Sequence, residues 1–177
     1  EKKQYILLNK PKNFSCRLDD FGKKNSVFEL IKKTCKEKVL PVTKLNKNTS
    51  GLVLFTNDEK LSSKLSNPKN KFKKIFHISL NKALKSTDLK KIKDGVIIDG
   101  EKIMVDSISY VLGKEKTEIG LEIKSNIRNI TYKIFNELNY KIIKLDLVFY
   151  AGLTKKDIPR KKTRFLSKNE INILKRL

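Results

Sequence analysis

The segment VTKLNKNTSGLVLFTND, residues 42 to 58, places polar side chains between two strand-like runs, as in a loop that carries chemistry. Asn46 stands in the middle of this loop, between Lys44 and Lys47. A carboxamide carries no negative charge and its nitrogen lone pair is delocalised, so Asn46 cannot act as a nucleophile or as a base. The loop therefore has the setting of a catalytic site, with an amide where an acid would act.

The rest of the chain lacks the usual catalytic and metal-binding sets. His77 is the only histidine, and there is no GxSxG motif or glycine-rich phosphate loop. Cys16 and Cys35 are isolated in the sequence, so the four ligands of a structural zinc site cannot be assembled. We interpret both as buried, reduced thiols of a cytoplasmic protein, and we expect neither a metal nor a cofactor.

A few acids could replace a missing nucleophile, but each has a simpler interpretation. Asp58 fits a turn or a helix cap, and Asp106 fits a turn at the start of a strand. Asp19 and Asp20 fall in an early loop, where solvated side chains are expected. No motif near any of these residues recommends it as a catalytic acid.

The charge of the chain indicates a polyanionic partner. There are 41 Lys and Arg against 19 Asp and Glu, which gives a net charge of +22. Nucleic acid is the leading candidate, since each phosphate that is neutralised releases counterions. A membrane surface would require a basic amphipathic helix with a broad apolar face, and none is found. Only five of the cations are Arg, and this skew indicates AT-rich coding DNA, which contributes part of the charge.

The elements that must position the loop mix strands with helices. Strands are expected at residues 5–10, 52–56, 73–80, 105–112, 117–124 and 141–150, and helices at 26–34, 58–66, 86–95, 131–138 and 167–177. The expected helix caps are Ser26 with Glu29, Asn57, and Ser167 with Glu170. Hairpins together with helices that do not alternate strictly predict an α+β fold with flanking helices and a mixed, mostly antiparallel sheet, without an internal boundary.

Several separated segments carry a family resemblance. The order YILLNKPKNF, KLNKNTSGLVLFTND, KKIFHISL and GLEIKSNIRNITYKIFNELNYKIIKLDLVFYAGL resembles the catalytic domain of ribosomal-RNA pseudouridine synthases of the RsuA/RluB type. The resemblance implies a pseudouridine synthase fold with a central RNA-binding cleft over residues 1–177, a monomer, and no cofactor. A small S4-like domain usually precedes this domain in the family, and we expect it to be absent from this chain, which begins at Glu1 without Met.

The resemblance also identifies three positions at which this chain departs from the family. The family's Arg-Leu-Asp triplet, whose Asp acts on a flipped uridine, falls on Lys44, Leu45 and Asn46. The family's Lys-x-Tyr motif places its Tyr on Phe76, which keeps the ring and loses the hydroxyl. The Arg that pairs with the Asp falls on Ile127, with Arg128 one residue away.

These departures leave several interpretations open. Catalysis is lost naturally, or Asn46 is an engineered trap, or the alignment is displaced; the protein could also be an active enzyme that uses another acid, or a general polyanion binder. The side chains expected to line the RNA cleft are Lys44, Lys47, Lys73, Lys74, Phe76, Lys124 and Arg128, with a solvated charged face as the alternative for the lysines and a core position for Phe76. The expected partner is ribosomal RNA of the large subunit. The basic segment 155–167 is expected to touch phosphates or to dock the last helix.

Overall fold

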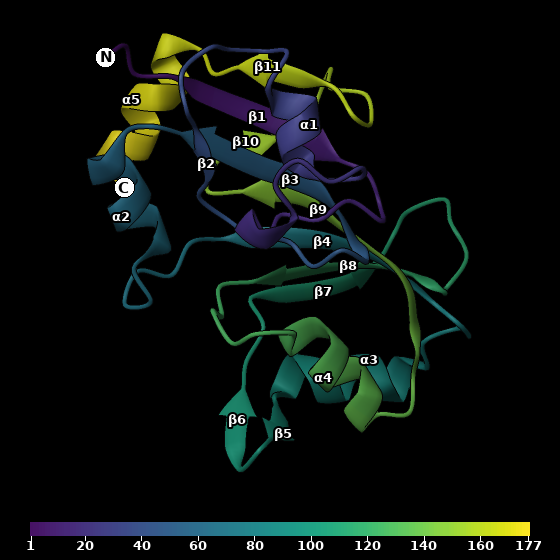
Figure 1. Cartoon of the computed structure of the whole chain (residues 1–177). Coiled ribbons are helices and arrows are strands. Elements are labelled where there is room, and N and C mark those ends of the chain that lie inside the picture. Colours follow the sequence, from purple (N-terminus) through teal and green to yellow (C-terminus); the bar gives the residue numbers. More distant parts are fainter. The chain divides into compact units, whose positions relative to one another are not determined.

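The computed structural model describes residues 1–177, which divide into two compact units (Figure 1). Unit 1 consists of Glu1–Asn70 and Val148–Leu177, and unit 2 consists of Lys71–Leu147. The prediction of one domain over residues 1–177 stays a prediction.

Unit 1 is built on antiparallel strands. β1 (Tyr5–Lys10) pairs with β3 (Thr49–Thr56) on one side and with β11 (Thr163–Phe165) on the other. The register sets Lys10 opposite Gly51, so the end of β1 lies at the start of β3. Two short strands extend this arrangement: β2 (Leu40–Pro41) pairs with β3, and β10 (Leu153–Thr154) pairs with the end of β9 (Ile142–Tyr150).

The core of unit 1 follows from alternation along these strands. Ile6 and Leu8 of β1 and Val53 and Phe55 of β3 point to the same face, since side chains two residues apart in a strand share a face. That face is covered by α1 (Val27–Ile31), whose Val27, Phe28 and Ile31 are buried against it. Removing these apolar surfaces from water is the main stabilising term of the unit.

The other helices of unit 1 are a 3-10 turn η1 (Leu18–Asp20), α2 (Glu59–Ser66) and α5 (Lys168–Arg176). The predicted capping box of α5 is confirmed, because Ser167 and Glu170 each accept the other's backbone N–H. Ser26 caps α1 as predicted, but its hydroxyl accepts the N–H of Phe28, and Glu29 pairs with Lys32 in place of completing a box.

The predicted cap of α2 is wrong by one residue. Asp58 accepts the backbone N–H of Leu61 and is the N-cap. Asn57 instead accepts the N–H of Gln4 at 2.7 Å and donates to the carbonyl of Lys2, so it ties the N-terminal segment to the start of the helix. Both side chains can cap a helix, and the tertiary contact with residues 2–4 decides between them.

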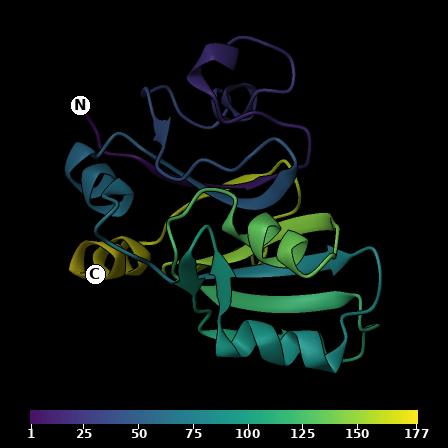
Figure 2. The same ribbon diagram turned by 90° about the horizontal axis from the view of Figure 1, so that it is seen from below.

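Unit 2 has a second antiparallel arrangement, in which β4 (Lys74–Leu80) pairs with β8 (Glu118–Ile123) and β8 pairs with β7 (Ser107–Tyr110). The alternate residues Ile119, Leu121 and Ile123 of β8 are buried. They share one core with residues of α3 (Ser86–Asp94) and α4 (Ile130–Glu137), which cover this face (Figures 1 and 2). The other face is polar and carries His77, Ser79 and Glu118 in one hydrogen-bonded group.

A hairpin in unit 2 was not among the predicted elements. β5 (Val96–Ile98) and β6 (Glu101–Ile103) are joined by Asp99 and Gly100, both with positive φ, which is the two-residue turn that suits a hairpin. The Asp-Gly pair between two apolar runs is the sequence pattern that indicates this hairpin. It directly follows a segment with helical spacing, so the two short strands were not recognised. The preceding helix ends where predicted, at Gly95, with φ of +107°.

The α+β fold class with flanking helices is confirmed, and the pairings that unite the strands of each unit are antiparallel. The expected central RNA-binding cleft stays a prediction. None of the helices combines the length and the apolar character required to cross a membrane.

Candidate active site

The Asn46 loop lies between β2 and β3 in unit 1. The N–H of Thr49 donates to the carbonyl of Asn46 at 2.9 Å, which closes a tight turn just before the strand begins. Thr49 is buried, whereas Asn46, Lys47 and Asn48 are exposed. The turn therefore presents the side chain of residue 46 at the surface.

A buried lysine supports this loop from inside the unit. Lys10 has no exposed surface, and its ammonium group donates to the carbonyls of Thr49 at 2.6 Å, Pro11 at 3.1 Å and Lys47 at 3.4 Å. Burial lowers the pKa of Lys10 to about 8, and the charge of Arg160 acts in the same direction. The three carbonyls satisfy the three N–H groups, so the lysine fixes the backbone around residues 47–49.

Two further contacts fix the loop. The backbone N–H of Asn13 donates to the carbonyl of Lys47 at 2.8 Å. The backbone of Leu45 hydrogen-bonds the thiol of Cys16, and burial raises the pKa of this cysteine. Leu45 itself packs against the core of unit 1. The segment 10–16 thus holds the residues on both sides of Asn46.

Phe76 occupies a core-related position in unit 2. It lies on β4 opposite Leu121 of β8 and packs, half-buried, against the apolar core of the unit. A ring in this position contributes packing without a hydroxyl group. The alternative that Phe76 has a structural role therefore has direct support, and base stacking stays a prediction.

The loop that contains Ile127 is held by Lys74. The ammonium group of Lys74 donates to the carbonyl of Ser125 at 3.3 Å and to Oδ1 of Asn126 at 3.4 Å, and burial lowers its pKa. Ile127 and Arg128 are both exposed. The structure therefore brings the β4 motif and the Ser125–Asn129 loop together within unit 2.

Apart from Lys74, the predicted RNA-binding cations fall into two groups by their partners. Lys73 forms an ion pair with Glu122 at 2.8 Å, and Lys124 forms one with Asp106 at 3.8 Å. Lys44 and Lys47 of the Asn46 loop are exposed and have no acidic partner, and neither has Arg128. The second group is better suited to bind phosphate, since no carboxylate competes for these cations.

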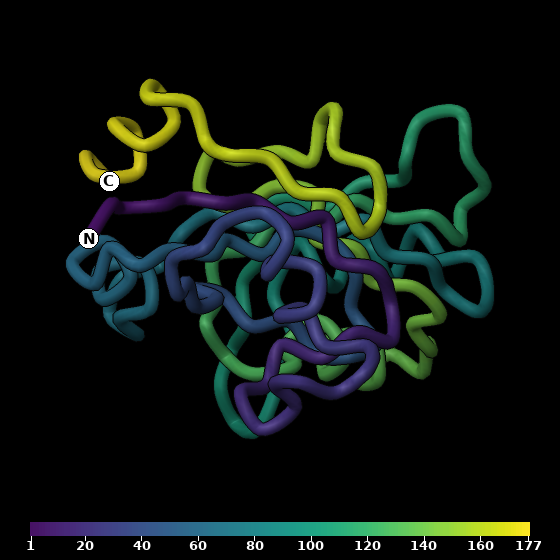
Figure 3. Tube along the Cα trace, turned by 45° about the horizontal axis from the view of Figure 1, so that its top comes forward, coloured from purple at the N-terminus to yellow at the C-terminus, as the bar shows by residue number.

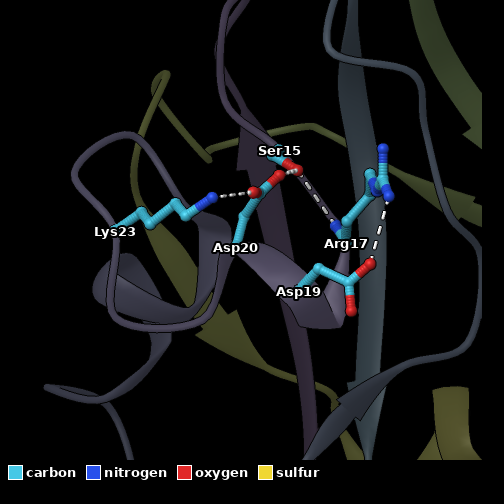
Figure 4. A network of polar contacts seen from close by, with 5 residues as sticks. All are labelled: Ser15, Arg17, Asp19, Asp20 and Lys23. Atoms are coloured by element: carbon cyan, nitrogen blue, oxygen red, sulfur yellow. Dashed lines mark hydrogen bonds and ion pairs between the residues drawn. The ribbon is translucent and has the colours of Figure 1, made fainter.

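The other acids considered as nucleophiles have structural partners. Figure 4 shows the loop in which Asp20 accepts the hydroxyl of Ser15 at 2.6 Å and pairs with Lys23, while Asp19 pairs with Arg17. The hydrogen bonds from Ser15 and Lys23 lower the pKa of Asp20.

Asp58 and Asp106 are also occupied. Asp58 caps α2 and accepts the hydroxyl of Tyr5 at 2.5 Å, in agreement with the capping interpretation. Burial alone would raise the pKa of Asp58, but these two hydrogen bonds lower it. Asp106 precedes β7, where its N–H donates to Glu122 and its carboxylate pairs with Lys124.

Some residues of interest were missed in the sequence. Lys10 stands at the end of a predicted strand, and no signal in the sequence marks its side chain as buried. Asp146 is a buried carboxylate on β9, and the signal for it is an acid between Leu145 and Leu147 in an apolar run. No cluster of three or more His, Cys, Asp or Glu side chains could hold a metal ion.

Comparisons with known proteins point to one family. The profile of the family described as "RNA pseudouridylate synthase" matches residues 4–169. The chain is 26% identical to an "Uncharacterized RNA pseudouridine synthase" of Borreliella burgdorferi, over 97% of this chain and 68% of that protein. It is 27% identical to "Ribosomal large subunit pseudouridine synthase B" of Bacillus subtilis, over 100% of this chain and 73% of that protein.

A solved structure shares the fold. The structure described as "Crystal structure of pseudouridylate synthase" superposes with a TM-score of 0.83 at 23% identity, and the match covers 98% of this chain and 74% of that chain.

Proposed function

This chain belongs to the RNA pseudouridylate synthase family, and from that premise we propose that it binds ribosomal RNA while the family reaction is lost or blocked at Asn46. The family reaction turns uridine into pseudouridine. The bond between N1 of the uracil base and the ribose breaks and a bond from carbon 5 to the ribose forms. Carbon 5 gives up its proton and N1 takes one up, so the product is an isomer of uridine. The family's Asp takes part in this exchange as a nucleophile or base.

One observation carries the proposal: an exposed amide stands at the tip of a loop that several contacts hold in place. The Lys10 ammonium group and the N–H of Asn13 both bind the backbone of this loop, so residue 46 has a defined position without any charge. Removing a nucleophile usually lowers the rate by a factor on the order of 10⁴ to 10⁶. An amide at this position is therefore expected to leave almost no turnover.

Two other features support the loss of catalysis. Ile127 stands where the family has the Arg that pairs with its Asp, so the acid and its basic partner are both missing from this chain. Phe76 stands where the family has Tyr, and its ring packs against the core. The acids Asp19, Asp20, Asp58 and Asp106 hold structural contacts, which argues against a replacement nucleophile among them.

The RNA partner follows from charge and from the relatives. The net charge of +22 suits a phosphate backbone, and relatives from Bacillus subtilis and Buchnera aphidicola are named as large-subunit enzymes. We place the protein in the cytoplasm with large-subunit ribosomal RNA, acting as a monomer. A role in ribosome assembly would then come from binding an RNA stem-loop.

The test is tritium release from unmodified ribosomal RNA labelled at carbon 5 of uridine. The natural protein is expected to release no tritium while binding the RNA in a filter assay. Asn46→Asp restores the carboxylate, and Asn48→Asp is the matched control, because it adds the same charge to an exposed residue of the same loop.

Each outcome has a separate meaning. Tritium release by the natural protein would show that another acid works, and the proposal would be wrong. Release by Asn46→Asp and not by Asn48→Asp would place the block at residue 46 alone. If the natural protein and both variants bind the RNA and none of them releases tritium, other parts of the site have also lost the residues that the reaction requires. Equal binding of ribosomal RNA and of random polyanions would favour a general polyanion binder.

A further inference from the structure

Exposed cations gather on three segments of unit 1 that contain no acidic residue. The segments are residues 9–14, 43–50 and 158–162, and none of them includes Asp or Glu. Their exposed cations are Lys12, Lys44, Lys47, Arg160, Lys161 and Lys162. We call these six residues the six-cation surface.

The third segment is tied to β1 through one buried residue, Asn9. The backbone of Asn9 exchanges hydrogen bonds with Lys161 and Lys162, at 2.9 and 3.1 Å. Its side-chain amide donates to the carbonyl of Ile158 at 2.7 Å, and its Oδ1 accepts from Arg160 at 2.5 Å. Asn9 is only 4% exposed, so these bonds are shielded from water. The cations of the loop are therefore presented on a fixed backbone.

The three segments meet at the Lys10 end of β1. The ammonium group of Lys161 lies 5.4 Å from the ring centroid of Phe14, and the N–H of Asn13 donates to Lys47. The tube in Figure 3 shows the yellow C-terminal segment running beside the purple segment that follows β1. The charge of Arg160 is also close enough to Lys10 to act on its pKa, and Lys10 binds the Asn46 loop directly.

This arrangement suits the backbone of a nucleic acid strand. Five of the six cations have no acidic partner, namely Lys12, Lys44, Lys47, Lys161 and Lys162. Together they create a positive potential that attracts an anion. A fixed loop loses little conformational entropy on binding, which favours affinity. Cations on three segments can contact successive phosphates, and such contacts position a strand without reading its sequence.

We propose that the six-cation surface binds the phosphate backbone of the RNA strand whose nucleotide lies at the Asn46 loop. This inference rests on the proposed function. It adds Lys12 to the RNA-binding residues, and within the basic segment 155–167 it assigns the phosphate contacts to residues 160–162. The surface acts on affinity and on the placement of the strand, and it takes no part in the reaction.

The test compares two double variants that each remove two positive charges. Lys161→Gln/Lys162→Gln removes cations of the six-cation surface and leaves the contact of Arg160 with Asn9 intact. The matched control is Lys60→Gln/Lys168→Gln, on α2 and α5, where both lysines are exposed and lie in the same unit. Affinity for a fluorescein-labelled ribosomal RNA stem-loop is measured by anisotropy between 50 and 300 mM KCl, with circular dichroism to check folding.

Each phosphate contact contributes roughly a factor of five at 0.1 M salt, because the slope of log K against log salt is about −0.7 per contact for a single strand. The Lys161/Lys162 variant is thus expected to bind about 25-fold more weakly, with a slope less steep by about 1.4. The control variant is expected to lose less than about threefold, through long-range charge alone.

The outcomes separate the two claims. If the natural protein does not bind the RNA, the proposed function fails and this inference fails with it. If the natural protein binds the RNA and both double variants lose affinity equally, the proposed function stands, and the proposal that the six-cation surface binds the RNA backbone is wrong. Competition by polyglutamate as strong as by RNA of equal charge would also overturn it, since the surface would then fit acidic proteins equally well.

Discussion

The two ends of β1 differ in how their charges are balanced. At the Tyr5 end, Asp58 accepts the hydroxyl of Tyr5, and Glu37 accepts the amide of Gln4. Arg164, opposite Leu7 on the neighbouring strand, forms a two-bond ion pair with Glu170. At the Lys10 end, the adjoining segments carry cations and no acid.

The net charge of +22 is therefore not spread evenly along β1 and the segments next to it. Where carboxylates occur near β1, they cap helices and pair with side chains, so they contribute to stability. At the Lys10 end, the ammonium group of Lys10 is buried and is satisfied by carbonyls. We expect changes at the Tyr5 end to alter stability, and changes of exposed residues at the Lys10 end to alter RNA binding.

Lys10→Ala has the largest expected effect, because Lys10 is fully buried and its ammonium group donates to three carbonyls. The substitution leaves a cavity and removes the donor from three carbonyls, so it should lower the free energy of unfolding by about 2–4 kcal/mol. Urea unfolding at pH 7 measures this loss. Lys10→Met, which keeps most of the volume, should cost less, and a loss below about 1 kcal/mol for Lys10→Ala would contradict the supporting role.

Glu170→Gln should lower the free energy of unfolding by about 1–3 kcal/mol at pH 7, through the ion pair with Arg164 and the helix cap. The hydrogen bond from Arg164 is the main cause that lowers the pKa of Glu170 from 4.5 to about 2. Between these values the unfolded chain binds more protons than the folded chain, so the contribution is complete above pH 4.5 and is lost as the pH falls toward 2. The difference between the natural protein and the variant should therefore vanish near pH 2, and a difference independent of pH would argue against the ion pair.

Asp58→Ala should cost about 1–2 kcal/mol, since it removes the cap of α2 and the partner of Tyr5. Asp58→Asn is the control, because an amide still caps a helix while it removes the charge. Comparing the thermal unfolding of the two variants separates the contribution of the helix cap from that of the negative charge. The affinity for RNA should stay unchanged in both variants. A change in affinity would contradict the expectation that the Tyr5 end of β1 contributes to stability and not to RNA binding.

Lys47→Gln should have the smallest effect on stability, within about 0.5 kcal/mol, because its side chain is exposed. Its RNA affinity should fall about fivefold at 0.1 M salt, as for one lost phosphate contact. Lys60→Gln at α2 is the single-charge control. Equal losses of affinity in the two variants would mean that RNA responds only to total charge.

Several elements could be predicted from the sequence because their signals are local. The alternation in β8, the apolar run of β3, and the capping box of Ser167 and Glu170 lie within a few residues. The amide at position 46 is likewise visible in the sequence, and so is the family, because its motifs occur in order along the chain.

The elements that were missed depend on distant residues. The strand β11 exists because Thr163–Phe165 pairs with β1, more than 150 residues earlier in the chain. The choice of Asp58 over Asn57 as a cap depends on residues 2–4. Among the predicted RNA-binding lysines, only the structure distinguishes Lys73, paired with Glu122, from Lys47, which has no acidic partner.

The family, the fold class and the uncharged residue 46 can all be recognised in the sequence, because they depend on residue identities and on short-range periodicity. Two features are visible only in the folded chain: Lys10 is buried beside the Asn46 loop, and Asn9 ties residues 158–162 to the same end of β1. Whether a side chain is buried, and which group it bonds, depends on backbone groups that are distant in the sequence and come close only when the strands pair. A local sequence pattern does not contain this information.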